Sequence, residues 1–306
     1  MTGDKDVQLV IVGSIGLDTV ATPRDRREEI LGGSVSYACA AASFFARVGM
    51  VGIVGNDFPE SCVDLYRRFG IDLAGLQRAA GRTFRWSGVY EADLNSRRTL
   101  LTELNVFGSF MPELPAAYRR APFVFLANIS PELQLHVLSQ AEAPKFVAAD
   151  TMDLWIATAR EPLMKVIRSV DLLTLNESEA RLLAGEHNLV KAARRILEWG
   201  PEHVIVKKGE HGALLFSRQG TAAIPAFPLE DVLDPTGAGD TFAGGLMGAL
   251  AETGGVDAAT LRRAMAYGAV VASFGVEAFS LERLERLTRA EIEARLGAYR
   301  QLTHFG

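Results

Sequence analysis

The feature of this chain that most constrains its fold is a regular alternation of short apolar runs with helical patterns. The apolar runs are rich in β-branched residues and cover Val7–Gly13, Val51–Gly55, Phe123–Ala127, Lys145–Ala149, Asp171–Leu175 and His203–Lys207. Helical patterns lie between several of them, at Ser34–Val48, Glu177–Leu183 and Leu189–Trp199. Continuously apolar strands that alternate with helices are typical of a parallel sheet covered on both faces. We therefore predict an α/β fold whose ligands bind beyond the carboxyl ends of the strands.

Two segments interrupt this alternation. Thr19–Ile30 is polar, and Thr83–Leu104 alternates aromatic and polar residues around the turn-like sequence "DLNS". The second segment therefore predicts a β-hairpin inserted into the α/β fold. Because both segments leave the sheet near the ends of early strands, we expect them to form a small β lid over the site. The alternative is that both are surface excursions.

Length, charge and cysteine content limit the classes of function. The chain has 306 residues and a formal net charge of −5, with its Lys and Arg residues dispersed along the sequence. Nucleic-acid binding needs clustered positive charge to neutralise phosphates, so a small-molecule ligand is favoured. The two cysteines, Cys39 and Cys62, are expected to be free thiols in a reducing compartment.

We expect no contact with a membrane. The N-terminal "MTGDKD" carries both charge signs and lacks the basic, apolar and small-residue order of a signal peptide. The longest uncharged run, Gly32–Ala46, is shorter than the roughly 18 residues that a membrane-spanning helix requires. These patterns predict a cytoplasmic protein.

The segment Asp234–Gly245, "DPTGAGDTFAGG", combines a glycine loop with the start of an apolar helix. Gly237 and Gly239 permit positive φ, so that successive N–H groups can converge on one point. The helix expected from Asp240 onward adds the positive end of its dipole there. No Lys-Ser or Lys-Thr follows the glycines, as a Walker loop requires, and Phe242 occupies the third glycine position of the dinucleotide fingerprint. The loop therefore predicts an anion site of another kind, with phosphate as its ligand.

Asp240 needs its own explanation, because a carboxylate repels an anion. A general base that accepts the proton of an attacking hydroxyl, while the loop N–H groups hold a phosphoryl group, accounts for both features. The alternative is that Asp240 is a helix-start residue favoured by the dipole and that the glycines only form a turn.

In full, the segment Asp234–Gly245 resembles the C-terminal signature of the ribokinase-like, or PfkB, carbohydrate kinase family. Further segments resemble family motifs in the family's order, namely "GSIGLD" at Gly13–Asp18, "GGSVSYACAA" at Gly32–Ala41, "VGNDF" at Val54–Phe58, "NESE" at Asn176–Glu179 and "KKGEHG" at Lys207–Gly212. The resemblance covers nearly the whole chain. It implies a single ribokinase-like domain over residues 1–306, with three α/β/α layers, a mainly parallel central sheet and a β-sheet lid at about 19–30 and 83–104.

The resemblance implies a phosphoryl-transfer site around the glycine loop, with Asp240 as the catalytic base. The anion hole then corresponds to the backbone amides of Gly237, Ala238 and Gly239. Asn176 and Glu179 match the family's N-x-x-E motif, which places Mg²⁺ and phosphate mainly through water. The alternative for this pair is a capping box at the start of a helix, and the two roles can coexist.

The nucleotide, expected to be ATP, has its own group of matching residues. The resemblance assigns to it Lys207, Gly209, Gly212 and Thr236. A surface hairpin would account equally for the G-x-x-G turn. The segment Ala266–Phe279 should flank the adenine and a monovalent-cation loop, and its apolar character leaves activation by K⁺ open.

Asp18 resembles the family's carboxylate that binds substrate hydroxyls, so the acceptor is expected beside it. The alternative is that Asp18 only takes part in a turn at the end of the sheet. Gly32 and Gly33 match the paired glycines through which the substrate approaches the backbone. Tyr37 occupies a position where the family often has Asn, and Gly16 one where many of its sugar kinases have Asn. These departures put a ribose-type hydrogen-bond pattern in doubt.

The implied function is an ATP-dependent sugar kinase that transfers the γ-phosphoryl group to a hydroxymethyl group of a carbohydrate. A nucleoside kinase of the same family is the alternative, since Tyr37, Phe84, Trp86 and Tyr90 could stack on a base or simply pack the lid. A catalytically silent binding protein is disfavoured, because the catalytic motifs are intact. We expect the "DLNS" tip to affect the acceptor KM more than the ATP KM, and the lid to offer a surface for a homodimer.

Overall fold

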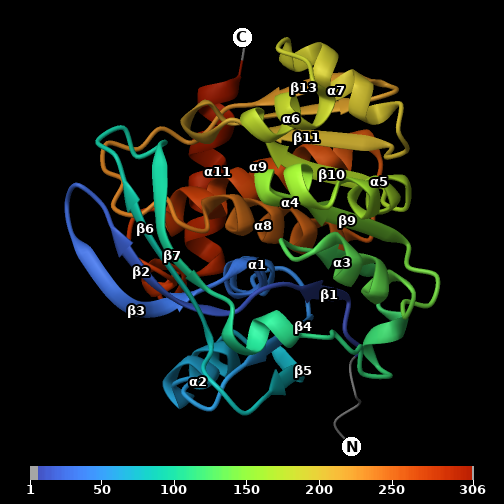
Figure 1. The fold of residues 1–306 in the computed structure, drawn as a ribbon. Helices are drawn as coiled ribbons and strands as arrows, with labels where there is room; N and C mark the ends of the chain where they lie inside the picture. Colours follow the sequence, from blue (N-terminus) through green and yellow to red (C-terminus); the bar gives the residue numbers. More distant parts are fainter. Residues whose placement is uncertain (1–5, 305–306) are drawn as a thin grey trace, which may run out of the picture.

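The predicted apolar runs all form strands of one nine-stranded sheet (Figure 1). The computed structural model describes residues 6–304, so most of the segment "MTGDKD" lies outside the described residues. In chain order the strands are β1 (Leu9–Val12), β4 (Val48–Val54), β5 (Asp72–Arg78), β8 (Phe123–Leu126), β9 (Phe146–Asp150), β10 (Leu172–Asn176), β11 (His203–Lys207), β12 (Ala213–Ser217) and β13 (Gly220–Ile224). Their order across the sheet is β13-β12-β11-β10-β9-β8-β1-β4-β5.

The sheet is mainly parallel, as predicted. Every neighbouring pair from β11 to β5 is parallel. Strands β12 and β13 add an antiparallel edge, because each follows its neighbour through a short turn. The carboxyl ends of β1, β9, β10 and β11 therefore meet at one edge of the sheet, where ligands of such folds bind.

Eleven α-helices lie within the described residues. They are α1 (Ser34–Ala42), α2 (Glu60–Arg68), α3 (Pro131–Leu138), α4 (Asp153–Thr158), α5 (Arg160–Arg168), α6 (Glu177–Ala184), α7 (Leu189–Leu197), α8 (Ala238–Thr253), α9 (Ala258–Gly275), α10 (Glu282–Glu285) and α11 (Arg289–Thr303). The prediction of a helix over Ser34–Val48 was too long. Helix α1 ends at Ala42, and Val48 opens the fully buried strand β4 because it pairs with Leu9 of β1.

Side chains of the buried strands alternate between two hydrophobic cores. In β1, Leu9 and Ile11 belong to one core and Val10 and Val12 to the other. The first core packs the sheet against α1, α8, α9 and α11, and the second packs it against α3, α5, α6 and α7 (Figure 1). This arrangement gives the three α/β/α layers that the sequence predicted.

A separate four-stranded sheet, which we call the lid, has the order β3-β2-β6-β7. Its strands are β2 (Gly16–Ala21), β3 (Arg26–Gly32), β6 (Phe84–Tyr90) and β7 (Arg97–Glu103). The predicted hairpin at Thr83–Leu104 is thus β6 and β7, joined by the "DLNS" turn. The other lid segment is longer than the predicted 19–30, because β2 and β3 pair as far as Gly16 and Gly32.

Two further properties were predicted and can be checked directly. Cys39 is a buried free thiol in α1, and Cys62 is a half-buried free thiol in α2. Across the described part of the chain, no helix combines the length and the apolar character needed to cross a membrane.

Helices α1 and α8 pack backbone against backbone. A Cβ atom at Gly244 would overlap the backbone of Ala38, and one at Gly248 would lie 2.7 Å from the Ala42 carbonyl oxygen. Both helices begin at the site edge of the sheet, one after Gly33 and the other after Gly237. Their close packing therefore fixes the distance between the two helix N-termini.

We predict that Gly244→Ala lowers the free energy of unfolding by about 1–3 kcal/mol, the usual cost of overpacking a core. The control is Gly297→Ala in α11, where an added Cβ meets no atom within 4 Å. That change should raise the free energy of unfolding by about 0.5–1 kcal/mol, because alanine favours helix over glycine. Urea denaturation measures both. Equal stabilisation by the two substitutions would show that the α1–α8 contact does not constrain the helices.

Candidate active site

The glycine loop turns sharply into helix α8. Gly237 is the N-cap residue, with a φ of 74°, and the helix begins at Ala238. A side chain at Gly237 would overlap the ring of Tyr37, which lies directly against the loop. The Asp234 carboxylate accepts a hydrogen bond from the Thr236 N–H at 2.9 Å and so fixes the approach to the turn. Glycine is therefore required at position 237 for both backbone conformation and space.

The protein uses only part of the hydrogen-bonding capacity of this loop. The Ala238 N–H donates to the Pro235 carbonyl at 3.2 Å, which closes the turn. The Gly237 and Gly239 N–H groups make no hydrogen bond within the described residues. Together with the N-terminal dipole of α8, these two free amides are suited to bind an anion, as the sequence predicted. Of the three amides predicted for the anion hole, that of Ala238 is committed to the loop itself.

Asp240 lies in the first turn of α8, next to these amides. Burial raises the pKa of its carboxyl group to about 7, and the Asp150 carboxylate acts in the same direction. The positive charges of Lys207 and Arg97 act in the opposite direction. A carboxyl group with a pKa near neutrality can exchange a proton at physiological pH, as a general base must.

Lys207 and Asp150 form a buried ion pair beside the glycine loop. Lys207 Nζ lies 2.6 Å from Asp150 Oδ2, and the two side chains are only 17% and 5% exposed. Burial disfavours the charged form of Lys207, but the Asp150 and Glu179 carboxylates outweigh this and raise its pKa. A Cβ atom at Gly239 would lie 3.3 Å from Lys207 Nζ, so the ammonium group contacts the loop directly. The site therefore holds a fixed positive charge where a phosphate would bind.

Asn176 and Glu179 form the capping box that the sequence left as an alternative. The Glu179 N–H donates to Asn176 Oδ1 at 2.9 Å, and the Asn176 N–H donates to Glu179 Oε2 at 2.7 Å. Burial raises the pKa of Glu179 to about 7, while Lys207 lowers it and Asp150 raises it further. Glu179 of the capping pair thus belongs to the same charged cluster as Lys207, so the capping role does not exclude the predicted role near the phosphate.

Asp18 lies on β2, away from the strands that carry Lys207 and Asp150. A side chain at Gly32 would overlap the Asp18 carboxylate, and the Gly33 N–H acts to lower the pKa of that group. Burial raises the pKa of Asp18 to about 7, and the nearby Asp234 raises it further. Asp18 Oδ1 is buried and has no hydrogen-bond partner in the described structure. The paired glycines therefore make room for a carboxylate that can still accept a hydrogen bond.

Tyr37 is buried between the loop and the acceptor side. Its hydroxyl has no hydrogen-bond partner among the described residues. Burial raises the pKa of Tyr37 well above its usual value, and Asp234 and Asp18 contribute to the shift. The ring supports Gly237, while the hydroxyl group lies near the carboxylates of Asp18 and Asp234.

The lid reaches the glycine loop through β6 and β7. The Thr236 hydroxyl donates to the Tyr90 hydroxyl oxygen at 3.2 Å, which joins the lid to the loop. Arg97 of β7 lowers the pKa values of both Asp18 and Asp240, so its charge acts on both halves of the site. The Arg97 guanidinium also lies over the Trp86 ring, 5.5 Å from its centroid.

A cavity of about 500 Å³ opens beside the loop on the side of Lys207. Gly209 and Gly212, both with positive φ, line it together with Gly239 and Phe242. The lid tip, residues 93–95, lines the same cavity. The tip thus lies over the side predicted for the nucleotide, and its expected effect on the acceptor KM stays a prediction.

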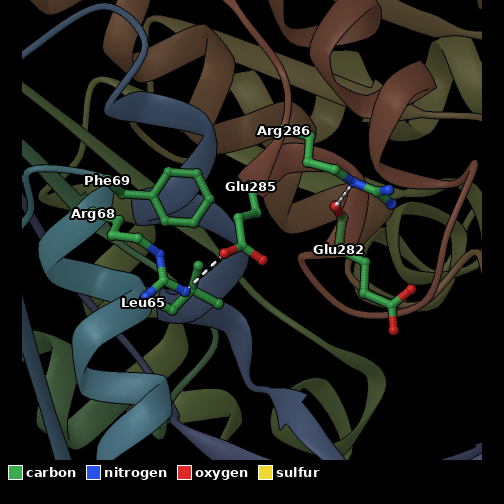
Figure 2. Close-up of a pocket in the computed structure, with 6 residues that line it drawn as sticks. All are labelled: Leu65, Arg68, Phe69, Glu282, Glu285 and Arg286. Carbon is green, nitrogen blue, oxygen red and sulfur yellow. Dashed lines mark hydrogen bonds and ion pairs between the residues drawn. The ribbon is translucent and has the colours of Figure 1, made fainter.

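A second cavity lies away from all the predicted site residues, between α2 and α10 (Figure 2). Its apolar wall is formed by Leu65 and Phe69, and the Arg68–Glu285 ion pair, 2.7 Å long, crosses one side. The Arg286 Nε–H donates to the Glu282 backbone carbonyl at 3.2 Å, and the cavity contains no part of the glycine loop.

Sequence reasoning missed three residues that the fold brings to the site. Asp150 ends an apolar run, Asp234 precedes the glycine loop, and Arg97 follows the lid tip. A carboxylate at the end of a predicted parallel strand was a usable signal for Asp150, since strand ends of this kind line ligand sites. The roles assigned to the individual site residues remain predictions.

Comparison with known proteins agrees with this geometry. The profile of the pfkB family carbohydrate kinases matches residues 8–282. A cytidine kinase of Thermococcus kodakarensis is 31% identical over 249 residues, which cover 79% of this chain and 87% of that enzyme. A ribokinase of Bacillus subtilis is 27% identical over 296 residues, covering 88% and 94% of the two chains. The structure of a Burkholderia thailandensis nucleoside kinase in complex with inosine superposes with a TM-score of 0.77 at 22% identity, covering 95% and 97%.

The fold and the site therefore define a phosphotransferase with an alcohol group as acceptor. The chain belongs to the pfkB family of carbohydrate kinases, whose relatives include both sugar and nucleoside kinases.

Proposed function

We propose that this kinase transfers the γ-phosphoryl group of ATP to a hydroxymethyl group on the sugar of a nucleoside. The observation that carries the proposal is the composition of one face of the lid. Asp18 of β2 and Trp86 of β6 are paired positions in parallel strands, so their side chains point to the same face. Trp86 packs with Val20, Tyr90 and Phe279 in the cluster beneath the lid. This face offers a carboxylate for sugar hydroxyls beside aromatic rings for a base.

A free sugar, which the sequence analysis placed first, is the second candidate. It is supported by the resemblance to ribokinase, and it requires only Asp18 and the paired glycines. It leaves the half-buried Trp86 and its Arg97 contact without a ligand-binding role.

In the proposed reaction Asp240 accepts the proton of the acceptor hydroxyl as that oxygen attacks the phosphoryl group. The Gly237 and Gly239 amides, the α8 dipole and Lys207 stabilise the charge of the transferring group. When bound, ATP would supply the phosphoryl group, and ADP would be the leaving group. The lid excludes water, which would otherwise compete with the acceptor.

Mg²⁺ is expected with the nucleotide, and the donor atoms present fit it. Mg²⁺ prefers oxygen ligands and usually keeps several waters beside one or two carboxylates and the substrate phosphates. The carboxylates of Glu179 and Asp150 lie near Lys207 at the loop, and Asn176 and Glu179 would hold the ion mainly through water. Activation by K⁺ stays a prediction of the resemblance.

A homodimer through the lid is also part of the proposal. Strand β7 is an edge strand of the lid sheet, and its Leu100 and Leu101 side chains are 58% and 50% exposed. Exposed apolar residues on an unpaired edge strand favour pairing with another strand. The molar mass in solution tests this, and a monomer at all concentrations would contradict it.

The experiment that tests the acceptor is a screen of nucleosides and free sugars by ADP release, repeated with Trp86→Ala. Since stacking of a base on an aromatic ring contributes about 1–3 kcal/mol, the variant should raise the nucleoside KM by about 5–150-fold. Its effect on a free sugar should be small. The control is Arg98→Ala, because Arg98 pairs with Val89 on the other face of the lid. A free pentose that outperforms every nucleoside, with no effect of Trp86→Ala, would overturn the nucleoside assignment.

For the catalytic base, we predict that Asp240→Asn lowers kcat by about 10²–10⁴-fold without weakening MgADP binding, because a general base acts in the transition state. The base must be deprotonated and its pKa is about 7, so kcat/KM of the unaltered enzyme should fall as the pH drops below about 7. Glu161→Gln, an exposed first-turn carboxylate of α5, is the matched control. Near-normal turnover of Asp240→Asn would remove the assigned role.

For magnesium, we predict that Glu179→Gln raises the Mg²⁺ concentration needed for half-maximal rate by about 10–100-fold, the usual effect of losing an outer-shell partner. Glutamine can still close the capping box, so the thermal stability should change little. The rate is measured as a function of Mg²⁺ at saturating nucleotide. A fall in melting temperature with unchanged Mg²⁺ dependence would leave only the capping role.

A further inference from the structure

Both turns of the lid reach across to the walls of the nucleotide-side cavity. At the β6–β7 tip, the Asn95 side-chain amide donates to Glu210 Oε1 at 3.3 Å. At the β2–β3 turn, Arg24 Nη1 lies 2.6 Å from Asp231 Oδ1. Glu210 lines the cavity directly, and Asp231 lies in the loop that supplies its other wall, residues 226–235. The teal hairpin and the orange loop are adjacent in Figure 1.

The β6–β7 tip has a fixed shape of its own. The Asp93 carboxylate accepts hydrogen bonds from the Asn95 and Ser96 N–H groups, at 3.0 and 2.9 Å, and from the Ser96 hydroxyl at 2.9 Å. Leu94 has a φ of 55° and packs on the cluster of Val20, Tyr90 and Phe279 beneath the lid. The tip therefore holds Asn95 toward Glu210 without depending on Glu210 for its conformation.

The tip also meets the glycine turn at close range. A Cβ atom at Gly209 would lie 3.2 Å from Asn95 Oδ1, so the Asn95 side chain lies close to this turn. Asp93, Leu94 and Asn95 line the cavity together with Lys207 and Gly239, the two residues that meet at the anion site. The lid tip is thus a wall of the cavity that ends at the phosphate-binding amides.

We propose that the β6–β7 tip is part of the nucleotide pocket and that Asn95, through Glu210, is a nucleotide-positioning residue that links nucleotide binding to lid closure. The inference rests on the proposed function only in taking the cavity of about 500 Å³ as the nucleotide site. Nucleotide then binds more tightly to the closed lid than to the open one.

A consequence for the acceptor follows, because the lid carries Asp18 and Trp86 as well. Closure by nucleotide brings these residues over the acceptor side, so each ligand raises the affinity for the other by the same factor. The coupling runs through one rigid sheet, whose strands β2 and β6 pair along their length.

The experiment measures MgADP binding by titration calorimetry without acceptor. Asn95→Ala should raise the Kd by about 2–10-fold, the usual effect of losing one hydrogen bond. Asn95→Asp should raise it further, since it sets a carboxylate against Glu210, and the second change Glu210→Gln should relieve that increase. The control is Arg26→Ala, because Arg26 forms an exposed ion pair with Glu28 within the lid and touches neither cavity wall. In turnover assays the Asn95 variants should raise the ATP KM more than they lower kcat.

Hydrogen exchange gives an independent readout. MgADP alone should slow exchange of the backbone amides at residues 91–96, and Asn95→Asp should abolish this protection. Unchanged Kd values in both Asn95 variants, or a rate of hydrogen exchange at residues 91–96 that MgADP does not change, would overturn the inference while leaving the kinase assignment intact. If the unaltered protein bound no MgADP at all, both this inference and the proposed function would fall.

Discussion

The backbone contact between α1 and α8 is the constraint on which the site depends. Helix α1 begins beside the paired glycines of the acceptor side, and α8 begins at the anion loop. Gly244 and Gly248 let the two helices approach until backbone meets backbone, and Tyr37 of α1 supports Gly237 from below. The separation of the acceptor carboxylate from the anion loop is therefore set by main-chain packing, which tolerates little displacement.

The electrostatics of the site are costly without ligands. Asp18, Glu179 and Asp240 all have pKa values raised to about 7 by burial, so each binds a proton in the folded chain at a pH where the unfolded chain has lost it. Stability from this source is present at low pH and declines as the pH rises from about 4 to 7. Such a cluster fits a site that cations and hydrogen-bond donors complete, since active sites sacrifice stability for function.

The sequence predicted those features that local pattern determines. All six apolar runs are strands, the lid hairpin is present, and the capping box at Asn176 has the expected geometry, because each depends on residues a few positions apart. The end of α1 was misplaced because pairing of Val48 with β1 overrode the helical pattern. The Lys207–Asp150 pair could not be predicted, because it depends on the order of the strands in the sheet. The position of the lid tip could not be predicted either, because it depends on contact between segments far apart in the sequence.

The position of β1 between β4 and β8 has a consequence for synthesis of the protein. This strand pairs with β4 on one side and with β8 on the other, and the pairing of Leu9 with Phe123 spans more than a third of the chain. Pairings so distant in sequence form slowly, because the intervening chain must first be closed into a loop. During translation β1 keeps one unpaired edge until β8 has left the ribosome, and the contact of α1 with α8 must wait much longer. The nascent chain therefore exposes the apolar edge of β1 until β8 emerges, which makes this stage open to aggregation and to capture by chaperones.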